Sequence, residues 1–400
     1  MKLKKLAIII THPIQYYVPV FQILAKECNL KVFYTWGKKG VGIKYDPDFK
    51  KLISWDLPLL ENYNYELVDN FARDPGSHHF NGIYNPTLIS SITDFSPNAI
   101  LIYGWAYKSH LNTIRYFKGK IPVWFRGDST LLNERKGVKQ LLRFLFLKWV
   151  YKNIDNALYV GSANKAYFKK FGLKESQLVF VPHAIDNNRF SKDHSQEAIS
   201  LRFKLGINDT ETVVLFAGKL EQKKNLELLL KAFIELKMEN IHLLFVGNGE
   251  LEESLKRTAE SFYYTKDEIS NKIKSLPKNN IHFMDFQNQS YMPIAYQACD
   301  LLVLPSKSET WGLTVNEAMA AGKAIFVSNH VGCSNDLIKE GVNGSVFKVE
   351  NKPDLIEKFK NLITNKDRLR KMGEESRKII RDWSFENQVD QIIRILNATK

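Results

Sequence analysis

Short apolar runs alternate with amphipathic helical stretches along the chain, and this alternation limits the possible folds more than any other feature. In the first half, apolar runs that read as buried strands lie at 6–11, 30–36, 98–103, 121–126, 156–161 and 178–182. Helical patterns fall between them, around 14–27, 106–117, 138–152 and 162–171. Strands that alternate with helices predict an α/β protein with parallel sheets.

The alternation breaks once and then restarts, which predicts two domains. Residues 183–196 lack apolar periodicity and read as a linker, and a new strand pattern begins at Glu211. A chain of 400 residues is long enough for two domains. We therefore expect a first domain at 1–190 and a second domain at 191–383.

Glu309 and Glu317 give the best clue to function. The segment that contains them follows an apolar run and reads as a strand end, a tight turn at Gly312 and the first turns of a helix. Such a turn presents free backbone N–H groups to an anion. A carboxylate beside an anion suits sugar or ribose hydroxyl groups, because an ionised Glu only accepts hydrogen bonds. The pattern indicates a site for a sugar joined to a phosphate, although acidic pairs at this spacing also occur by chance.

An earlier strand, loop and helix pattern supplies two cations. Lys219 follows Gly218 at the end of the strand pattern, and Lys224 stands at the start of the next helix. Two cations there would oppose the charge of a diphosphate. Lys223 and Lys224 alone would read as a solvated charge run, but the later glutamate pair favours a site.

Four segments in this order resemble the retaining nucleotide-sugar glycosyltransferases of family 4, the glycosyl transferases group 1. They lie within 210–345 and read VLFAGKLEQKKNLELLLKAF, LLFVGNGEL, IHFMDFQNQSYMPIAYQACDLLVLPS and ETWGLTVNEAMAAGKAIFVSNHVG. The resemblance implies the GT-B fold, in which two Rossmann-like parallel-sheet domains face each other across a cleft. It also implies that the C-terminal helix, about 384–400, crosses back onto the first domain.

The resemblance implies roles for individual residues. Glu309 would meet the donor sugar and Glu317 the ribose, while Lys219 and Lys224 would meet the diphosphate; Lys219, Lys224 and Glu309 are the expected catalytic residues. The expected donor-binding residues are Gly218, Gly247, Phe286, Thr310, Trp311, Gly312, Leu313, Thr314 and Glu317. Lys219 stands where the family usually has Arg, so it keeps the charge but not the bidentate fork.

The implied activity is transfer of a hexosyl or N-acetylhexosaminyl group from a UDP- or GDP-sugar to an acceptor hydroxyl, without metal or cofactor. The acceptor would be a glycan or lipid-linked saccharide of surface polysaccharide assembly. A second interpretation is a non-catalytic basic protein that binds polyanions or membrane lipid and keeps a vestigial nucleotide site. The intact lysines and glutamates favour the enzyme, and donor turnover would separate the two.

The first domain is expected to hold the acceptor. Ligands of open parallel sheets meet the carboxyl ends of strands, which selects His12, Trp105, Arg126 and Asp128. His12 reads either as a group that polarises an acceptor hydroxyl or as a cap of the following helix. Arg126 stands where some relatives carry a His, so Asp128 becomes a candidate for contacting acceptor or donor. The alternative for Asp128 is a turn residue that caps a backbone N–H.

Composition restricts the compartment and the partners. Cys28, Cys299 and Cys333 lack metal-ligand spacing and are odd in number, which fits a reducing compartment such as the cytoplasm. The first apolar run is too short for a secretory signal, and no stretch approaches the ~20 apolar residues of a membrane span. The net charge of +14 predicts attraction to polyanions, but without a nucleic-acid-binding motif we expect no nucleic-acid partner.

The segment 135–153 mixes basic and aromatic residues, among them Lys136, Lys139, Arg143 and Trp149. Such a segment can lie in the interface of an anionic membrane. The alternative, which its wide apolar stripe favours, is a helix that covers the sheet. One helix with two faces satisfies both, so peripheral binding at the inner face of the membrane stays open.

Three weaker motifs indicate no further site. The acidic triplet at 46–48 imitates a metal-binding motif but reads as a turn. His78 and His79 lack a partner at ligand spacing, so no metal is expected there. Gly247 and Gly249 lack the full dinucleotide fingerprint, so they predict a tight turn and not an NAD site.

Overall fold

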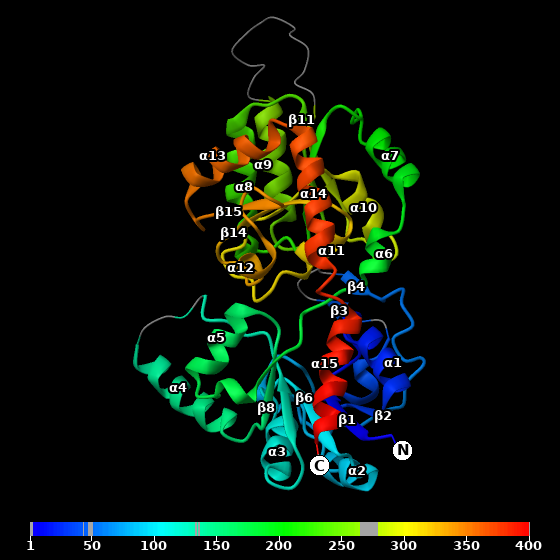
Figure 1. The fold of residues 1–400 in the computed structure, drawn as a ribbon. Helices are drawn as coiled ribbons and strands as arrows, with labels where there is room; N and C mark the ends of the chain where they lie inside the picture. Colours follow the sequence, from blue (N-terminus) through cyan, green and yellow to red (C-terminus); the bar gives the residue numbers. More distant parts are fainter. Residues whose placement is uncertain are drawn as a thin grey trace, which may run out of the picture. The chain divides into compact units, whose positions relative to one another are not determined.

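The computed structural model describes residues 3–42, 44–46, 51–132, 134, 137–264 and 279–399. The chain divides into two compact units, drawn in Figure 1. Unit 1 comprises 1–44, 57–184 and 383–400, and unit 2 comprises 45–56 and 185–382. The assignment of acceptor and donor roles to the two domains stays a prediction.

Unit 1 contains a seven-stranded sheet that is parallel throughout. In spatial order its strands are β5 (Tyr65–Leu67), β2 (Asn29–Tyr34), β1 (Lys5–Ile10), β6 (Ala99–Tyr103), β7 (Val123–Arg126), β8 (Asn156–Tyr159) and β9 (Leu178–Phe180). The six strands expected from the sequence are confirmed. The sequence pattern does not reveal β5, because its three residues are half-buried and mixed in polarity.

Helices cover both faces of this sheet (Figure 1). They are α1 (Val18–Glu27), α2 (Leu88–Phe95), α3 (Lys108–Phe117), α4 (Val138–Tyr151), α5 (Ser162–Lys170) and α15 (Phe385–Ala398). Alternate residues of β1 enter two different cores: Leu6 and Ile8 pack with α1 and α15, while Ala7 and Ile9 pack with α2 to α5. This period of two is the pattern of a strand buried on both faces.

Unit 2 contains a six-stranded sheet, also parallel throughout. In spatial order its strands are β12 (Ile281–Met284), β11 (Ile241–Val246), β10 (Thr212–Ala217), β13 (Leu301–Leu304), β14 (Ala324–Ser328) and β15 (Gly344–Phe347). Its helices are α6 (Asn187–Ser191), α7 (Ser195–Lys204), α8 (Leu226–Leu236), α9 (Glu252–Tyr264), α10 (Met292–Ala298), α11 (Leu313–Ala320), α12 (Ser334–Leu337), α13 (Lys352–Ile363) and α14 (Lys366–Ile380). Two parallel-sheet α/β units confirm the expected fold class. Within the described residues, no helix is long and apolar enough to cross a bilayer.

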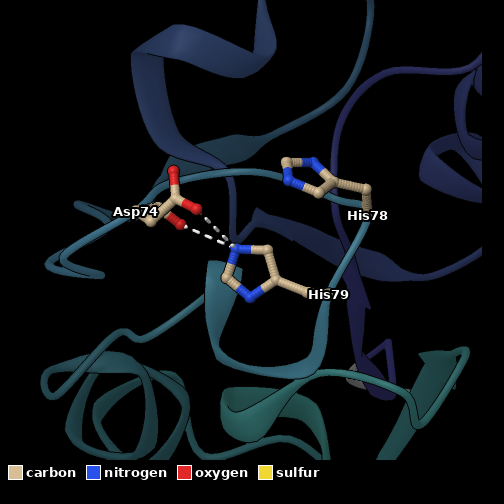
Figure 2. Close-up of side chains that lie close together, drawn as sticks. All are labelled: Asp74, His78 and His79. Atoms are coloured by element: carbon tan, nitrogen blue, oxygen red, sulfur yellow. Dashed lines mark hydrogen bonds and ion pairs between the residues drawn. The ribbon is translucent and has the colours of Figure 1, made fainter.

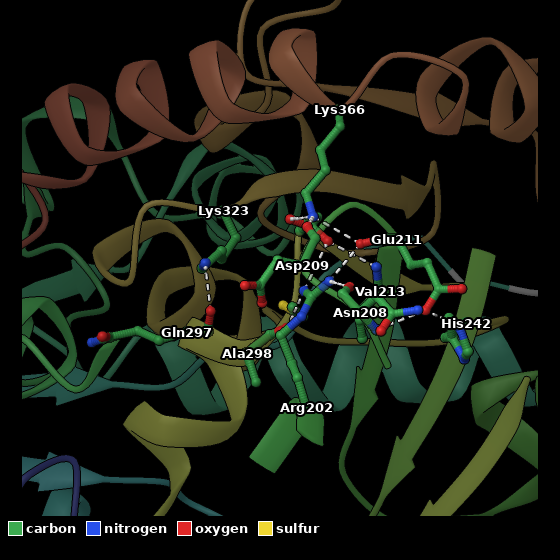
Figure 3. Close-up of polar contacts among 12 residues, drawn as sticks. Arg202, Asn208, Asp209, Glu211, Val213, His242, Gln297, Ala298, Lys323 and Lys366 are labelled. Carbon is green, nitrogen blue, oxygen red and sulfur yellow. Dashed lines mark hydrogen bonds and ion pairs between the residues drawn. The ribbon is translucent and has the colours of Figure 1, made fainter. Parts of the chain in front are cut away.

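A polar cluster holds the N-terminal edge of the unit 2 sheet (Figure 3). The guanidinium of Arg202 donates to the Ala298 carbonyl at 3.0 Å and contacts the Asp300 carboxylate at 3.3 Å. The Lys366 ammonium donates to the Glu211 carbonyl at 2.8 Å, and burial lowers the pKa of Lys366. These charged groups therefore bind the protein's own main chain and carboxylates, whereas ligands of open parallel sheets meet the opposite, carboxyl-end edge.

The segment expected to be a linker contains a helix, α6. Its first turn is capped by the Asp186 carboxylate, which accepts a hydrogen bond from the Arg189 N–H at 3.0 Å. Phe190 is buried, and its ring centroid lies 5.7 Å from that of Tyr296. A local cap and one buried aromatic hold this helix. Its five residues are too few to show periodicity in the sequence.

Residues 45–56 group with unit 2, although they interrupt unit 1 in the sequence. The Lys51 ammonium contacts the Asp285 carboxylate at 2.7 Å, and the ring centroids of Trp55 and Phe286 lie 6.1 Å apart. Two short strands, β3 (Lys44–Asp46) and β4 (Lys51–Ile53), form a separate sheet here. Of the acidic triplet at 46–48, only the first residue lies within the described part of the chain.

Candidate functional site

Most of the expected donor-site residues of unit 2 follow the carboxyl ends of two neighbouring strands, β10 and β13, while Gly247 and Phe286 follow β11 and β12. Chain order reverses between β10 and β13, because β11 and β12 lie on one side and β14 and β15 on the other. Gly218 and Lys219 directly follow β10, and the loop with Glu309 follows β13. Ligands of open α/β sheets bind at such a reversal point.

Lys224 and Glu309 form an ion pair across this point, although they are 85 positions apart in the sequence. The Lys224 ammonium donates to Glu309 Oε2, and the two side chains are only 14% and 18% exposed. The adjacent Lys223 is 55% exposed and pairs with Glu221 at 3.1 Å. Lys223 is therefore a solvated surface charge, whereas Lys224 pairs with Glu309, a second expected site residue.

Gly312 makes the turn that starts α11. Its φ of +100° is in the left-handed region. This conformation favours glycine, and a Cβ there would also be crowded, at 3.0 Å from Val331 Cγ1 and 3.1 Å from Leu304 Cδ2. The helix begins at Leu313, and its first backbone N–H groups, from Leu313 and Thr314, have no partner within the helix. The positive end of a helix dipole favours an anion there.

Glu317 is a buried carboxylate, only 2% exposed. Its Oε2 accepts a hydrogen bond from the Tyr296 hydroxyl at 2.6 Å. Tyr296 is fully buried in α10, and sequence reasoning did not single it out because an aromatic residue in a helix reads as core. A buried carboxylate is costly without a donor. Tyr296 supplies one and fixes the orientation of Glu317.

Two further expected donor residues, Trp311 and Thr310, differ in the exposure of their side chains. Trp311 is 2% exposed, and its Nε1 donates to Asn316 Oδ1 at 2.9 Å. Its main-chain carbonyl accepts from the Cys333 N–H at 3.0 Å. Thr310 is exposed. The Trp311 side chain therefore belongs to the core, so its expected role can come only from the main chain.

The loops after β10 and β11 approach each other very closely. Gly247 has a φ of +137°, and a Cβ there would lie 2.1 Å from the Gly218 carbonyl oxygen. Asn248 is 4% exposed, and its Oδ1 accepts from the Phe286 N–H at 2.8 Å. Its amide donates to the Asp285 carboxylate at 2.9 Å. Asn248 therefore fixes the main chain at Phe286, where the base was expected, and its position between two glycines was the available signal.

In unit 1, Arg126 is buried and bound to the main chain. It is 1% exposed, and its two Nη atoms donate to the carbonyls of Val181 at 2.9 Å and Pro182 at 3.1 Å. Burial raises the pKa of the nearby Tyr17 hydroxyl above its usual range, and the charge of the Arg126 guanidinium partly opposes this rise. These contacts make Arg126 a group that positions the chain around it, and direct contact with an acceptor stays a prediction.

His12 does not cap the following helix. α1 begins at Val18 after Tyr17, and no side chain caps it. His12 Nδ1 lies 2.8 Å from Thr11 Oγ1. The reading of His12 as a cap of the helix was therefore wrong, and its action on an acceptor hydroxyl stays a prediction.

The other two acceptor-side candidates lie partly exposed in unit 1. The ring centroid of Trp105 lies 5.4 Å from that of Phe146, a residue of α4. Asp128 is also partly exposed, and its charge is one of the causes that raise the pKa of Tyr17. The role of Asp128, in a turn or in contact with substrate, stays a prediction.

The sequence did not single out two buried histidines of unit 1, His110 and His183. Burial, with the charge of Arg126, lowers the pKa of His183 to about 3, and burial lowers that of His110 to about 4. His110 Nδ1 lies 2.9 Å from the Gly104 carbonyl, which only accepts, so Nδ1 carries the proton. Nε2 then accepts from the Thr35 hydroxyl at 2.8 Å. Both imidazoles are neutral near pH 7.

Asp74, His78 and His79 form the one group in the described part of the chain that could hold a metal ion (Figure 2). Their ligand atoms lie within 4.8 Å of one another. His79 Nε2 lies 3.0 Å from the Asp74 carbonyl and 3.4 Å from its carboxylate. Asp74 is a partner that sequence spacing did not reveal. Because Asp74 and His78 are exposed and none of the expected donor residues belongs to this group, we assign it no part in the site.

Residues 198–379 match the family Glycosyl transferases group 1. This part of the chain belongs to the glycosyl transferases group 1. The matched region contains Lys219, Lys224, Glu309 and Glu317, and it contains Tyr296 and Asn248, which sequence reasoning missed.

Two curated relatives, one of them named as a glycosyltransferase, match part of the chain. An uncharacterized glycosyltransferase of Methanocaldococcus jannaschii is 29% identical over 46% of this chain and 44% of its own length. The alpha-galactosylglucosyldiacylglycerol synthase of Streptococcus pneumoniae is 22% identical over 67% of this chain and 66% of its own length. The chain thus matches less than two thirds of either relative.

One solved structure matches this fold over nearly the whole chain. Anabaena HepE, in complex with UDP and glucose, has a TM-score of 0.70 and 16% identity, covering 99% of this chain and 100% of the other. At this identity the likeness concerns the fold alone, which is GT-B.

Proposed function

We propose that the chain transfers a sugar from a UDP- or GDP-sugar to an acceptor hydroxyl with retained anomeric configuration. The observation that carries this proposal is the Lys224–Glu309 pair at the reversal point between β10 and β13, within the region that belongs to the family. A partly buried cation beside a carboxylate and a helix N-terminus suits a sugar joined to a diphosphate. The transferred group would be a hexosyl or N-acetylhexosaminyl unit.

In the proposed reaction, the bond between the anomeric carbon and the diphosphate oxygen breaks as the acceptor oxygen bonds to the same face of that carbon. The acceptor proton passes to the departing diphosphate oxygen. Lys224 and Lys219 stabilise the negative charge that develops on the diphosphate, together with the N-terminal N–H groups of α11. Charge stabilisation by these groups makes a metal unnecessary.

Glu309 has a second task in this proposal. Glu309 binds Lys224 in the structure, so in this proposal the ammonium is preorganised for the diphosphate. When the diphosphate arrives, Lys224 transfers its hydrogen bond to phosphate, and the Glu309 carboxylate accepts hydrogen bonds from the sugar hydroxyls. Preorganisation of this kind lowers the cost of ordering a flexible lysine at the moment of reaction.

The nucleoside half of the donor is assigned to more rigid groups. Glu317, oriented by Tyr296, would accept from the ribose hydroxyls, and the main chain at Phe286, held by Asn248, would meet the base. The complex of Anabaena HepE with UDP supports a uridine nucleotide in this fold. It does not decide between UDP and GDP here.

We propose a glycan or lipid-linked saccharide of surface polysaccharide assembly as the acceptor. The Streptococcus pneumoniae relative is named for a glycolipid product, which supports an acceptor of this class. Cys28, Cys299 and Cys333 are free and buried, which fits the expected cytoplasmic compartment.

Donor turnover tests the proposal against a non-catalytic basic protein with a vestigial site. The purified chain is screened against UDP- and GDP-sugars for a rise in melting temperature, and stabilising donors are then assayed for release of nucleoside diphosphate. A ligand at 100 times its dissociation constant adds about 2.7 kcal/mol to the free energy of unfolding. Stabilisation with turnover supports the transferase, whereas stabilisation without turnover in the presence of glycan or glycolipid acceptors favours the vestigial site.

A further inference from the structure

Helix α4 exposes an unusually large apolar surface. Six of the sixteen large hydrophobic side chains that are exposed in the described residues lie on this one helix. We name these residues the α4 stripe: Val138 at 78% exposure, Leu142 at 63%, Leu141 at 59%, Leu145 at 55%, Trp149 at 42% and Phe146 at 41%. Figure 1 shows α4 on the outside of unit 1, beside α5. Contiguous exposed apolar side chains of this extent mark an interaction surface.

The α4 stripe is not part of the core, because α4 packs on the sheet with its opposite face. Leu147, Val150 and Tyr151 are fully buried there, and Phe144 packs beside them. Val138, Leu142, Leu145 and Trp149 repeat at the helical spacing of four, three and four positions, so they form one continuous row on the other side. The helix therefore has two apolar faces, and both alternatives from the sequence apply to it.

Lysines border the stripe. Lys139, Lys148 and Lys152 are exposed in or directly after α4. The Arg115 guanidinium of α3 lies 5.3 Å from the Trp149 ring, and the Lys120 ammonium, which follows α3, lies 3.3 Å from the Tyr116 ring. Neither α3 nor α4 contains an acidic residue. We name Lys139, Lys148 and Lys152 the lysine rim.

Two nearby charges do not belong to the rim. Arg143 points toward the core side, where its Nη2 donates to the Tyr167 hydroxyl at 3.1 Å and its guanidinium lies 5.6 Å from the Phe171 ring. Glu134, before the helix, binds Lys170 and accepts from the Gln140 amide at 2.6 Å, so it does not neutralise the rim. Lys136, which the sequence pattern included, lies outside the described residues.

We propose that α4 lies in the interface of an anionic lipid bilayer, with the stripe inserted among the acyl chains and the lysine rim on the headgroups. Apolar residues, an interfacial Trp and flanking lysines without acids are the composition of such a helix. A second copy of the chain fits less well, because two identical faces would bring two basic rims together. This binding concerns unit 1 alone and goes beyond the proposed transfer reaction.

The test uses the full chain with vesicles of phosphatidylcholine alone or with added phosphatidylglycerol, at low and high salt. The stripe variant carries Leu142→Ser, Leu145→Ser and Trp149→Ser, and the rim variant carries Lys139→Gln, Lys148→Gln and Lys152→Gln. The matched control carries Ile199→Ser and Phe203→Ser, which are 47% and 83% exposed on α7 of unit 2. All changed side chains are exposed, so melting temperatures close to that of the wild type confirm that each variant folds.

We expect the wild type to co-sediment with anionic vesicles at low salt and much less with neutral vesicles or at high salt. The rim variant should bind roughly 100-fold more weakly and the stripe variant at least about 10-fold more weakly, whereas the control should bind like the wild type. Equal binding of the stripe variant and the control would overturn the proposal. So would a wild-type dimer in sedimentation velocity that the stripe variant abolishes, because the stripe would then cover a second copy.

Nucleotide binding separates this inference from the proposed function. The stripe and rim residues lie in unit 1, so both variants should bind UDP or GDP as the wild type does when vesicles are absent. Loss of vesicle binding with intact nucleotide affinity supports the membrane inference whether or not sugar transfer is ever observed. If the wild type binds nucleotide but no vesicles, this result contradicts the membrane proposal and does not affect the assignment of the donor site.

Discussion

The carboxyl-end edges of the two sheets use their polar groups in opposite ways. In unit 2, site side chains bind other side chains: Lys224 binds Glu309, and the Tyr296 hydroxyl binds Glu317. In unit 1, the Arg126 guanidinium donates to main-chain carbonyls, and so does Nδ1 of His110. A side chain paired with another side chain can exchange that partner for a ligand, whereas a side chain that satisfies the main chain is part of the fold. The comparison therefore predicts that substitution of Lys224, Glu309 or Glu317 changes function, whereas substitution of Arg126 or His110 changes stability.

The largest effect is expected for Lys224→Ala. Removal of a preorganised cation beside the diphosphate should lower donor turnover by about 10²-fold or more. The free energy of unfolding should fall by about 1–2 kcal/mol, far less than a misfolded variant would show, because the Glu309 carboxylate loses one partner and keeps some access to water. Lys223→Ala is the matched control, since that side chain is 55% exposed and should keep turnover within a few-fold. Similar turnover of the two variants would remove Lys224 from the site.

Arg126→Ala should act on folding instead. It removes the donors to the Val181 and Pro182 carbonyls and empties a buried volume, so we expect a loss of about 3 kcal/mol in the free energy of unfolding. Chemical denaturation measures this loss, and UDP or GDP affinity of the folded fraction should stay unchanged. Normal stability with lost transfer would instead make Arg126 the acceptor contact that the sequence suggested.

An acid sensitivity of unit 1, of a size comparable to the effect of Arg126→Ala, is expected as well. The pKa of His183 is lowered to about 3 and that of His110 to about 4, against about 6.5 in an unfolded chain. Depressed folded-state pKa values contribute stability that is present above about pH 6.5 and is lost as the pH falls. Near pH 5, protonation of each histidine in the unfolded chain lowers the free energy of unfolding by about 2 kcal/mol. Denaturation curves between about pH 7 and pH 5 measure it, and constant stability over that window would show that these histidines are not buried and neutral.

The smallest expected effect is that of metal removal. Asp74, His78 and His79 lie in unit 1, outside the expected donor residues, and charge stabilisation at the diphosphate is assigned to lysines and backbone N–H groups. Treatment with a chelator should therefore leave donor turnover unchanged. Recovery of a lost activity on addition of Mg²⁺ or Mn²⁺ would show that a metal ion carries part of the charge that we assign to Lys224.

The same comparison explains what the sequence could predict. The strands and the two sheets follow from apolar alternation, and Lys224 and Glu309 follow from charged residues at the ends of strand patterns. Tyr296 and Asn248 did not follow, because an aromatic residue in a helix reads as core and an Asn between glycines reads as a turn. Their roles depend on which atoms meet after folding, at separations of 21 and 38 positions.

The roles of the acceptor-side residues were harder to predict from the sequence, for the same physical reason. Arg126 looks like a ligand group at a strand end, but its partners are carbonyls 55 and 56 positions later, and no local pattern announces them. The exposure of the α4 stripe also needed the structure. A helix with two apolar faces has the same composition as a buried helix, and only the packing shows which face is covered.

Calorimetry with UDP and GDP on the wild type, Glu317→Gln and Glu309→Gln tests the central claim most directly. Glu317, buried and oriented by Tyr296, is assigned to the ribose, so Glu317→Gln should weaken nucleotide binding by about 10-fold. Glu309 is assigned to the sugar, so Glu309→Gln should bind free nucleotide nearly as the wild type does and fail in transfer. Equal losses of nucleotide affinity in both variants, or no nucleotide binding by the wild type, would contradict the assignment of this edge of unit 2 to the donor.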